Sequence, residues 1–143
     1  MKRICLILTE LALCLTLVPA YAAGEMAVSD ADFKSAEGYD VRDSLTVLNN
    51  GGYFGFAGVD LSGIKSVTVK AKCSMPYGTN GDTLAVVLDD PKKGGDIGYV
   101  LINSEYETEF SANIKETAGK HDVYFVSCYG NNFYNSYISV EFN

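Results

Sequence analysis

The chain has 143 residues, 48% of them hydrophobic, and its 18 acidic side chains outnumber its 11 basic ones to give a net charge of −7. This length suits a single domain with one hydrophobic core. The negative charge disfavours nucleic acid and membranes as partners, because nucleic acid and anionic lipid would both repel it. The same charge has a simpler explanation, since it keeps an exported protein soluble.

The first 22 residues have the features of a secretory signal peptide. Lys2-Arg3 begins the chain, an apolar stretch runs from Ile4 to Val18, and Ala20-Tyr21-Ala22 fits the small-x-small pattern that signal peptidase cleaves. The apolar stretch is short for a membrane span and contains a glutamate. We therefore predict cleavage after Ala22, one domain over residues 23–143, and a secreted protein, either extracellular or periplasmic.

The rest of the chain has the pattern of short β-strands separated by turn residues. The segment Gly24–Ser35 is acidic and weakly patterned, and no window of ten or more residues after the leader has helical periodicity. Further along, apolar residues recur at every second position, which predicts strands with one packed face. These positions are Val67, Val69, Ala71 and Cys73; Leu84, Val86 and Leu88; Phe110, Ala112 and Ile114; and Ile138, Val140 and Phe142.

Turn-forming residues punctuate these segments at residues 49–52, 61–63, 76–81, 91–95, 118–119 and 130–132. About eight short strands at this spacing predict an all-β fold, a jelly-roll sandwich of two antiparallel sheets. The alternation also predicts that each sheet has one packed face and one face in solvent.

Two of the four cysteines lie in the leader, which leaves Cys73 and Cys128. Export would place both in an oxidising compartment, where a disulfide can form and persist. Cys73 shares the inward parity of its strand, whereas Cys128 could face either way. A Cys73–Cys128 disulfide and two small buried thiols both agree with this pattern.

Three turn-containing segments follow one another at Gly58–Gly63, Leu88–Gly94 and Gly119–Val126, after a glycine-rich strand entry at Asn49–Phe56. Their order and spacing resemble those of the family six carbohydrate-binding modules, which are small secreted β-sandwiches. The resemblance extends over most of the chain after the leader. It implies a non-catalytic module that holds a polysaccharide.

Members of that family bind sugars either among the loops at one end of the sandwich or on its concave face. At the loop site, two aromatic rings clamp a sugar ring beside an asparagine. The resemblance places the first ring at Val47, which is not aromatic, and the second at Tyr106, where the family usually has tryptophan. It places the asparagine at Asn135, with Asn131 and Asn132 as alternatives.

Residues 129–137 combine aromatic rings with side-chain amides, which suits a sugar that presents an apolar face and a fringe of hydroxyls. In the competing interpretation, Phe133 and Tyr137 plug the end of the core while the asparagines cap turns. Residues 75–80 form a second loop with an exposed tyrosine beside an asparagine. The candidate sugar contacts are therefore Tyr106, Asn135, Tyr134, Asn132, Asn131 and Tyr77.

Catalysis is not favoured by the acidic or nucleophilic residues. A glycosidase requires two carboxylates facing each other across a cleft, whereas Glu107 and Glu109 share the solvent face of one predicted strand. His121 is the only histidine and has no nucleophile elbow to serve, and no cysteine–histidine set fits zinc. We therefore predict that the protein is not an enzyme.

The family often carries a structural calcium ion held by a Glu-x-Glu pair near the N-terminus. The matching positions here are Ser29 and Ala31, and Asp30 and Asp32 lie one step out of register. A one-residue shift turns a strand side chain to the opposite face, so we predict no cofactor, because the usual acidic ligands of a structural calcium are missing.

The sequence thus predicts a secreted, non-catalytic protein that binds a polysaccharide or glycan and neither nucleic acid nor membrane. The alternative keeps the fold without the sugar. In that case the chain is an extracellular structural or protein-interaction domain whose partners are other secreted or cell-surface proteins.

Overall fold

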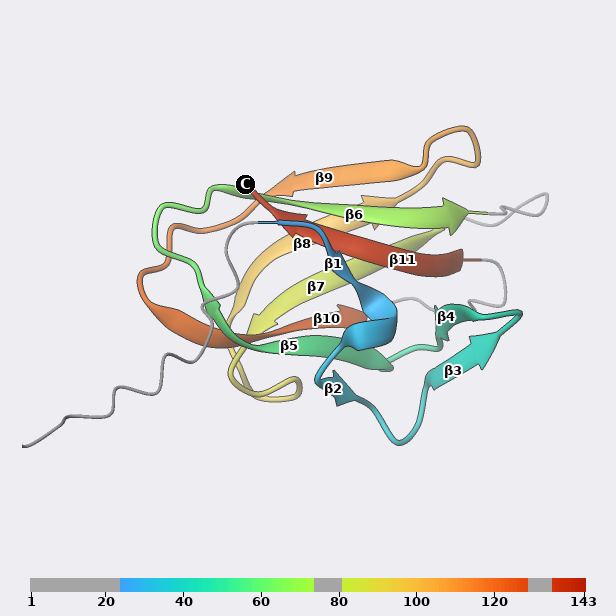
Figure 1. Ribbon diagram of the computed structural model, residues 1–143, viewed down its shortest axis with the longest axis horizontal. Helices are drawn as coiled ribbons and strands as arrows, with labels where there is room; N and C mark the ends of the chain where they lie inside the picture. Colours follow the sequence, from blue (N-terminus) through green and yellow to red (C-terminus); the bar gives the residue numbers. More distant parts are fainter. Residues whose placement is uncertain (1–23, 74–80, 129–134) are drawn as a thin grey trace, which may run out of the picture.

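Eleven β-strands and one short 3₁₀ turn make up the part of the chain that the computed structural model describes, residues 24–73, 81–128 and 135–143 (Figure 1). The prediction of an all-β fold is confirmed. The leader of residues 1–22 lies outside the described residues. The elements are β1 Met26–Ala27, η1 Val28–Asp30, β2 Phe33–Lys34, β3 Tyr39–Arg42, β4 Leu45–Leu48, β5 Tyr53–Asp60, β6 Ser66–Cys73, β7 Asp82–Leu88, β8 Asp96–Ile102, β9 Glu109–Asn113, β10 Lys120–Ser127 and β11 Asn135–Phe142.

The strands form two antiparallel sheets that pack face to face (Figure 1). Sheet A has the order β3-β4-β11-β6-β9, with β1 added along β11, and sheet B has the order β2-β5-β10-β7-β8. Neighbours in a sheet are mostly distant in sequence, so the chain repeatedly crosses between the sheets. This two-sheet antiparallel sandwich agrees with the predicted architecture. Its short strands β1 and β2 come from the weakly patterned segment Gly24–Ser35.

The core lies between the sheets and is lined by their inward-facing side chains. The Phe54 ring of β5 stacks on Phe125 of β10, with centroids 5.1 Å apart and planes at 15°. Burying one such side chain stabilises the fold by about 1.5–3 kcal/mol. The largest fully buried side chains are Tyr137, Phe54, Phe56, Phe125, Leu48, Leu61, Leu84, Ile102, Val28, Val67, Val69 and Val86.

Strand β6 follows its predicted pattern along its whole length. Val67, Val69 and Ala71 are fully buried and Cys73 is 8% exposed, while the side chains between them are less buried. β6 lies between β11 and β9 in the middle of sheet A, so one face meets the core and the other meets solvent. A strand in that place gives the clean alternation that sequence analysis can read.

The prediction for the last strand is wrong at Ile138, which is 38% exposed. The pairing of β11 with β6 shifts between Tyr137 and Ser139, so Ile138 is the extra residue of a β-bulge. Asn135 and Tyr137 face the core before the bulge, and Val140 and Phe142 face it afterwards. The inserted residue changes the parity of the strand, which brings Tyr137 inward in place of Ile138.

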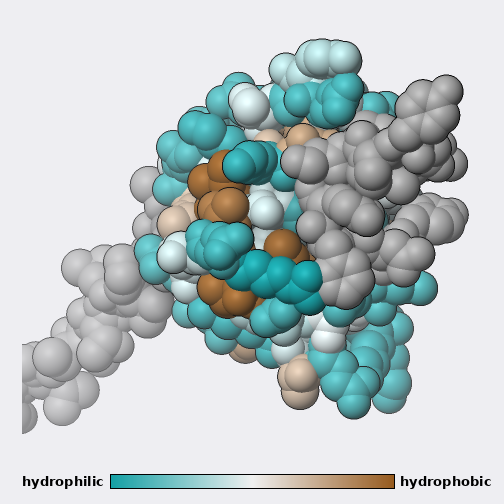
Figure 2. Space-filling view, turned by 90° about the vertical axis from the view of Figure 1, so that its right-hand side faces the viewer, coloured by the Kyte–Doolittle hydropathy of each residue, from teal (hydrophilic) through white to brown (hydrophobic). Residues whose placement is uncertain are grey.

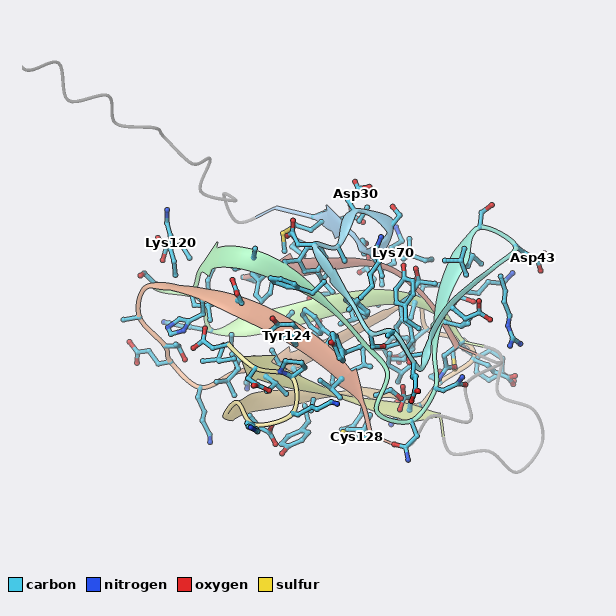
Figure 3. All side chains as sticks on the ribbon, turned by 90° about the horizontal axis from the view of Figure 1, so that it is seen from below. Asp30, Asp43, Lys70, Lys120, Tyr124 and Cys128 are labelled. Atoms are coloured by element: carbon cyan, nitrogen blue, oxygen red, sulfur yellow. The ribbon has the colours of Figure 1, made fainter. Side chains whose placement is uncertain are left out.

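The predicted solvent face of sheet B is also partly wrong, because a second apolar cluster covers it. Tyr124 of β10 is only 7% exposed although it points away from the core, and it packs with Ala85 and Val87 of β7. The Phe33 ring lies 5.1 Å from the Tyr124 ring, and the Tyr53 ring meets it edge-on at 5.6 Å. Figure 3 shows Tyr124 midway along β10 on this side of the sandwich.

Cys73 and Cys128 are free thiols, so the disulfide alternative does not hold in this structure. Cys73 belongs to the core cluster between the sheets, whereas Cys128 packs with the outer cluster of sheet B. The backbone of sheet B therefore separates them. Burial raises the pKa of both thiols, which keeps them protonated and slow to react.

Candidate functional site

Several strands end together at one end of the sandwich, which we call the apical end. It is defined by Cys73 of β6, Asp82 of β7, Ile102 of β8, Ser127 of β10 and Asn135 of β11. The register joins these residues, because Cys73 pairs with Asn135 and Asp82 with Ile102, and the Ser127 amide bonds to the Gly52 carbonyl at 2.9 Å. Antiparallel pairing therefore gathers the connections between these strands at this end. Figure 2 views the molecule from the apical end.

Tyr106 is the predicted contact that the apical end presents most openly. It lies in the connection between β8 and β9 and is 89% exposed. Its backbone amide donates to the Ser104 hydroxyl at 3.2 Å, which shapes the turn. A hydrogen bond with the Glu105 side chain raises the pKa of its phenol. The ring therefore offers an uncovered flat surface, and its hydroxyl stays protonated.

Asn135, the other predicted contact within the described residues, lies in a different environment. It begins β11 and is only 1% exposed. The structure brings the two residues to the same end of the sandwich. Glu105, the neighbour of Tyr106, is close enough for its charge to act on the Cys73 thiol, and Cys73 is the strand-register partner of Asn135. However, Tyr106 stands in solvent and Asn135 lies in the core. Val47, the position of the family's first ring, is also buried at 6% exposure.

The remaining predicted contacts, Asn131, Asn132, Tyr134 and Tyr77, lie outside the described residues. Those positions stay predictions. The described part of the apical end nevertheless contains polar residues that sequence analysis missed.

A buried polar cluster, Asp82, Ser127, Tyr137 and Asn135, lies beneath the apical end. The Asp82 carboxylate accepts hydrogen bonds from the Tyr137 hydroxyl at 2.5 Å and from the Ser127 hydroxyl at 3.0 Å. The Thr83 amide adds a third bond at 2.7 Å. All four members of the cluster are at most 3% exposed, so the cluster joins sheet B to sheet A within the core.

The pKa of Tyr137 reflects this environment. Burial raises it well above the ordinary value, and the nearby charge of Asp82 and the hydrogen bond to it act in the same direction. A hydrogen bond with the Asn135 side chain acts in the opposite direction. The Tyr137 hydroxyl therefore stays protonated and donates a hydrogen bond to Asp82.

A second surface with aromatic character is the outer face of sheet B. Besides the covered rings of its apolar cluster, the edge strand β8 exposes Tyr99 by 50% and Leu101 by 60%. The Tyr99 hydroxyl donates to the Asp96 carboxylate, which raises the pKa of the phenol. This face offers ring edges and aliphatic surface rather than one freely exposed ring.

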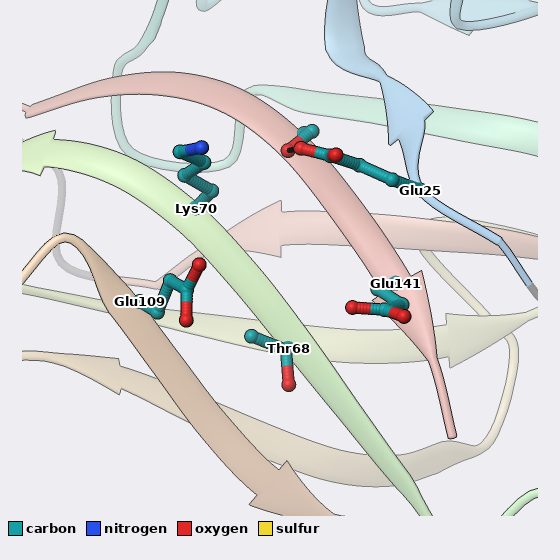
Figure 4. Close-up of a pocket in the computed structure, with 6 residues that line it drawn as sticks. Glu25, Thr68, Lys70, Glu109 and Glu141 are labelled. Carbon is teal, nitrogen blue, oxygen red and sulfur yellow. Dashed lines mark hydrogen bonds between the residues drawn. The ribbon is translucent and has the colours of Figure 1, made fainter.

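The outer face of sheet A carries a shallow hollow of a different kind (Figure 4). Residues from β6, β9 and β11, together with Glu25 just before β1, line it, and the Ser139 hydroxyl donates to the Glu25 carboxylate at 2.5 Å. No aromatic ring lies among its lining residues, so it lacks a surface on which a sugar could stack. The lining residues are Glu25, Thr68, Lys70, Glu109, Ser139 and Glu141.

The acidic residues near the N-terminus have structural contacts. Asp32 accepts a hydrogen bond from the Ala57 amide at 2.8 Å, and Asp30 accepts one from Ser29. In residues 24–73, 81–128 and 135–143, no three side chains of histidine, cysteine, aspartate or glutamate gather closely enough to hold a metal ion. Nor does this part of the chain contain a helix of the length and apolarity that crossing a bilayer requires.

His121 lies at the opposite end of the sandwich, near the start of β10. Its Nδ1 lies 3.0 Å from the Asp89 carboxylate and its Nε2 lies 3.1 Å from the Ala118 carbonyl. The hydrogen bond to Asp89 raises the pKa of the imidazole. Both ring nitrogens thus face acceptors, which suits a charged histidine that fastens two turns together. This arrangement supports the turn role over a catalytic one.

No protein-family model and no curated protein sequence matches the chain. Solved structures do match its fold. A family 6 carbohydrate-binding module from Clostridium cellulolyticum, solved with xylose, superposes with a TM-score of 0.69 at 18% identity and covers 84% of this chain and 96% of its own.

Two further modules agree with this comparison. CsCBM6-3 from Clostridium stercorarium, solved with cellobiose, gives a TM-score of 0.65 at 20% identity and covers 84% of this chain and 92% of its own. A β-1,3-glucan-binding CBM6 from Bacillus halodurans gives 0.66 at 18% identity, with 84% and 95% coverage. The order of turns predicted this likeness, and the chain has the β-sandwich fold of the family 6 carbohydrate-binding modules.

Proposed function

We propose that this protein is an exported, non-catalytic module that binds a polysaccharide or glycan at its apical end. The observation that carries the proposal is the exposed Tyr106 ring, which lies among the gathered strand ends of a fold shared with sugar-binding modules. A sugar presents an apolar C–H face, and a flat ring that is already uncovered can receive that face without rearranging the protein. The signal-peptide pattern of the leader supports export.

The affinity expected from this surface is weak. Tyr106 is smaller than the tryptophan usual at its position, and the chain contains no tryptophan at all. The position matching the other ring is the buried Val47. One-sided stacking buries less ring surface than a clamp does, so Tyr106 should supply a large share of the binding free energy.

Binding to xylan, cellobiose and a β-1,3-glucan, measured by calorimetry and affinity electrophoresis, tests the proposal. These probes follow from the sugars named for the similar structures. Tyr106→Ala should weaken binding by about five- to thirty-fold, the loss expected when about 1–2 kcal/mol of stacking is removed. Tyr106→Phe keeps the ring and should retain most of the affinity.

Tyr99→Ala is the matched control, because it removes a half-exposed tyrosine from the outer face of sheet B. It should leave the affinity unchanged. If Tyr99→Ala abolishes binding while Tyr106→Ala does not, the sugar binds on sheet B and the apical proposal is wrong. Absence of binding to all the glycans tested would contradict the sugar-binding function itself.

The second candidate function is a protein-interaction domain without a sugar. The observation that favours it is the pair Tyr99 and Leu101, which leaves aromatic and aliphatic surface exposed on the edge strand β8. Exposed apolar residues on an edge strand are a typical protein contact. Co-purification of a secreted partner that is lost in Leu101→Ser, with no effect of added glycan, would support this function over the first.

A further inference from the structure

Strand β8 differs from the other edge strands of the described residues in its lack of protection against further pairing. The strands at the sheet edges are β1, β2, β3, β8 and β9. β1 and β2 have two residues each, β3 contains Asp40 and Arg42, and β9 begins with Glu109. β8 has seven residues and carries no charge from Ile97 to Ile102. Natural edge strands are usually short or charged, because their open backbone groups otherwise pair with another strand.

The backbone groups of Tyr99 and Leu101 face outward from this edge. The Thr83 carbonyl of β7 accepts a hydrogen bond at 2.9 Å from the residue that follows β10, so the Thr83 backbone faces β10. The backbone of the next residue, Leu84, therefore faces β8, where Leu84 is paired with Val100. Since hydrogen-bonding direction alternates along a strand, the N–H and C=O groups on either side of Val100 face away from β7.

The open part of this edge is short. Ile97 is the extra residue of a β-bulge in the pairing of β8 with β7. Its carbonyl accepts a hydrogen bond from the Lys115 amide at 2.7 Å, which occupies the edge at that point. The open edge therefore begins after the bulge and is centred on Val100, between the exposed side chains of Tyr99 and Leu101.

This open edge is complementary to itself. If two β8 strands pair antiparallel about a two-fold axis at Val100, Tyr99 of one copy lies opposite Leu101 of the other, and the symmetry repeats the contact. Both residues occupy hydrogen-bonding positions, so each pair exchanges two backbone hydrogen bonds. The exposed ring of one copy then packs on the exposed aliphatic side chain of the other, a type of cross-strand contact that stabilises sheets.

The charges at the two ends of β8 favour the antiparallel arrangement. Lys92 and Lys93 are exposed in the turn before the strand, and Glu105 and Glu107 are exposed in the connection after it. Antiparallel pairing brings the start of one strand to the end of the other, so the lysines of each copy lie on the side of the other copy's glutamates. Among the described residues, neither lysine forms an ion pair.

The aspartates around this turn reduce the electrostatic contribution. Asp89 is bonded to His121, Asp90 accepts the amides of its own turn, and Asp96 accepts the Tyr99 hydroxyl. Their charges offset those of the two lysines. The apolar pair and the backbone hydrogen bonds therefore supply most of the contact, and the charges select its direction.

We propose that β8 joins two copies of this chain into a symmetric dimer, through antiparallel pairing of their edge strands centred on Val100. One strand per copy covers less than the roughly 1,200 Å² of a standard stable interface, and two copies with a net charge of −7 repel each other. The dimer should therefore be weak, with a dissociation constant of about 10⁻⁴ M. The pairing does not depend on sugar binding, and it directs the two apical ends away from each other.

Sedimentation equilibrium of the protein without any sugar, at up to about 1 mM, tests the proposal. The wild-type protein should form a dimer and no larger species, because two-fold pairing uses the open edge of both copies. Leu101→Lys adds the charge that natural edge strands carry and should raise the dissociation constant by about tenfold or more. Val41→Lys is the matched control, because it adds the same charge at an exposed apolar residue of the edge strand β3. It should leave the dissociation constant unchanged.

Two further measurements identify the contact as strand pairing. Leu101→Pro removes an amide that faces outward, so β7 should keep its hydrogen bonds while the dimer is lost; if this variant does not fold, Leu101→Lys decides the outcome. Isotope-filtered NMR of mixed labelled and unlabelled protein should show the Tyr99 ring of one copy in contact with the Leu101 methyl groups of the other.

A wild-type protein that stays monomeric at about 1 mM would overturn the proposal. So would a Leu101→Lys variant that dimerises like the wild type, or a dimer without the contact between Tyr99 and Leu101. A secreted partner that binds this edge while the protein alone stays monomeric would assign β8 to that partner instead. Because no sugar is present, the dimer stands or falls separately from the proposed sugar binding.

Discussion

Replacing Gly55 by alanine should destabilise the fold, because Gly55 lies directly beneath the Tyr124 ring. A Cβ atom at this position would stand 2.8 Å from Cδ1 of Tyr124 and 2.8 Å from the carbonyl oxygen of Val123. Real Cβ atoms essentially never approach that closely. The ring has little room to retreat, since Phe33 packs on it at 5.1 Å and Tyr53 at 5.6 Å.

Two effects of opposite sign set the magnitude. Overpacking of this kind costs about 1–3 kcal/mol. Replacing glycine by alanine also restricts the unfolded chain, which stabilises the fold by about 0.4–1 kcal/mol where the backbone allows it. Gly55 has no positive φ, so the second effect applies. The overpacking should prevail, and we expect a net loss of about 1–2 kcal/mol in the free energy of unfolding.

Urea denaturation followed by circular dichroism measures this loss directly. The thermal midpoint should fall by roughly 3–10 °C, and the near-ultraviolet signal of the tyrosines should change because the Tyr124 ring moves. Gly95→Ala is the control, since a Cβ there meets no atom within 4 Å and the backbone is not strained. If Gly55→Ala proves as stable as Gly95→Ala, the close packing of Tyr124 on β5 is refuted.

Three further predictions concern His121 at the end of the sandwich opposite the apical end, the two thiols, and the core. His121 has a raised pKa through its bond to Asp89, so its stabilisation is present below about pH 6.5 and is lost as the pH rises through the folded-state value. The difference in unfolding free energy between wild type and His121→Gln should therefore be larger at pH 5.5 than at pH 8.5, by less than about 1 kcal/mol for so exposed a pair; a larger difference at pH 8.5 would contradict this. Alkylation of the unfolded protein should modify both Cys73 and Cys128, whereas a disulfide-linked peptide pair in the mass spectrum would show otherwise. Phe54→Ala should cost about 3–5 kcal/mol in urea denaturation, and a loss below about 1 kcal/mol would show that Phe54 is not a central core residue.

The sequence predicted the fold because turn chemistry and alternation are local signals. Strand β6 was read correctly from Ser66 to Cys73 because its two faces meet different environments along its whole length. The order of glycine, proline and aspartate turns then fixed how such strands connect. The fold class and the resemblance to the family 6 modules could therefore be predicted without knowing any long-range contact.

Two features could not be read from alternation. The bulge at Ile138 adds one residue to β11 without adding one to β6, and a pattern of period two cannot contain an odd insertion. The burial of Tyr124 depends on Phe33 and Tyr53, which come from β2 and β5. Nothing in β10 alone distinguishes an outward tyrosine in solvent from one beneath neighbouring rings.

The polar cluster shows which signal could have revealed more of the site. Asp82 shares the parity of Leu84 and Val86 in β7, and Ser127 shares the parity of Phe125 in β10, so both occupy positions that the alternation assigns to the core. A polar residue at a core position near one strand end is easily dismissed as the end of the pattern.

The alternative is a buried network, and the topology decides between the two. The strands concerned are antiparallel neighbours, so the last core position of β10 meets the first core positions of β7 within sheet B, and the first of β11 faces them from sheet A. Polar side chains at those positions must therefore meet one another. Once the pairing is known, Asp82, Ser127 and Asn135 are expected to lie near one another at one end of the core, although each comes from the end of a different strand. Asp82, Ser127 and Tyr137 form one hydrogen-bonded cluster around a single carboxylate.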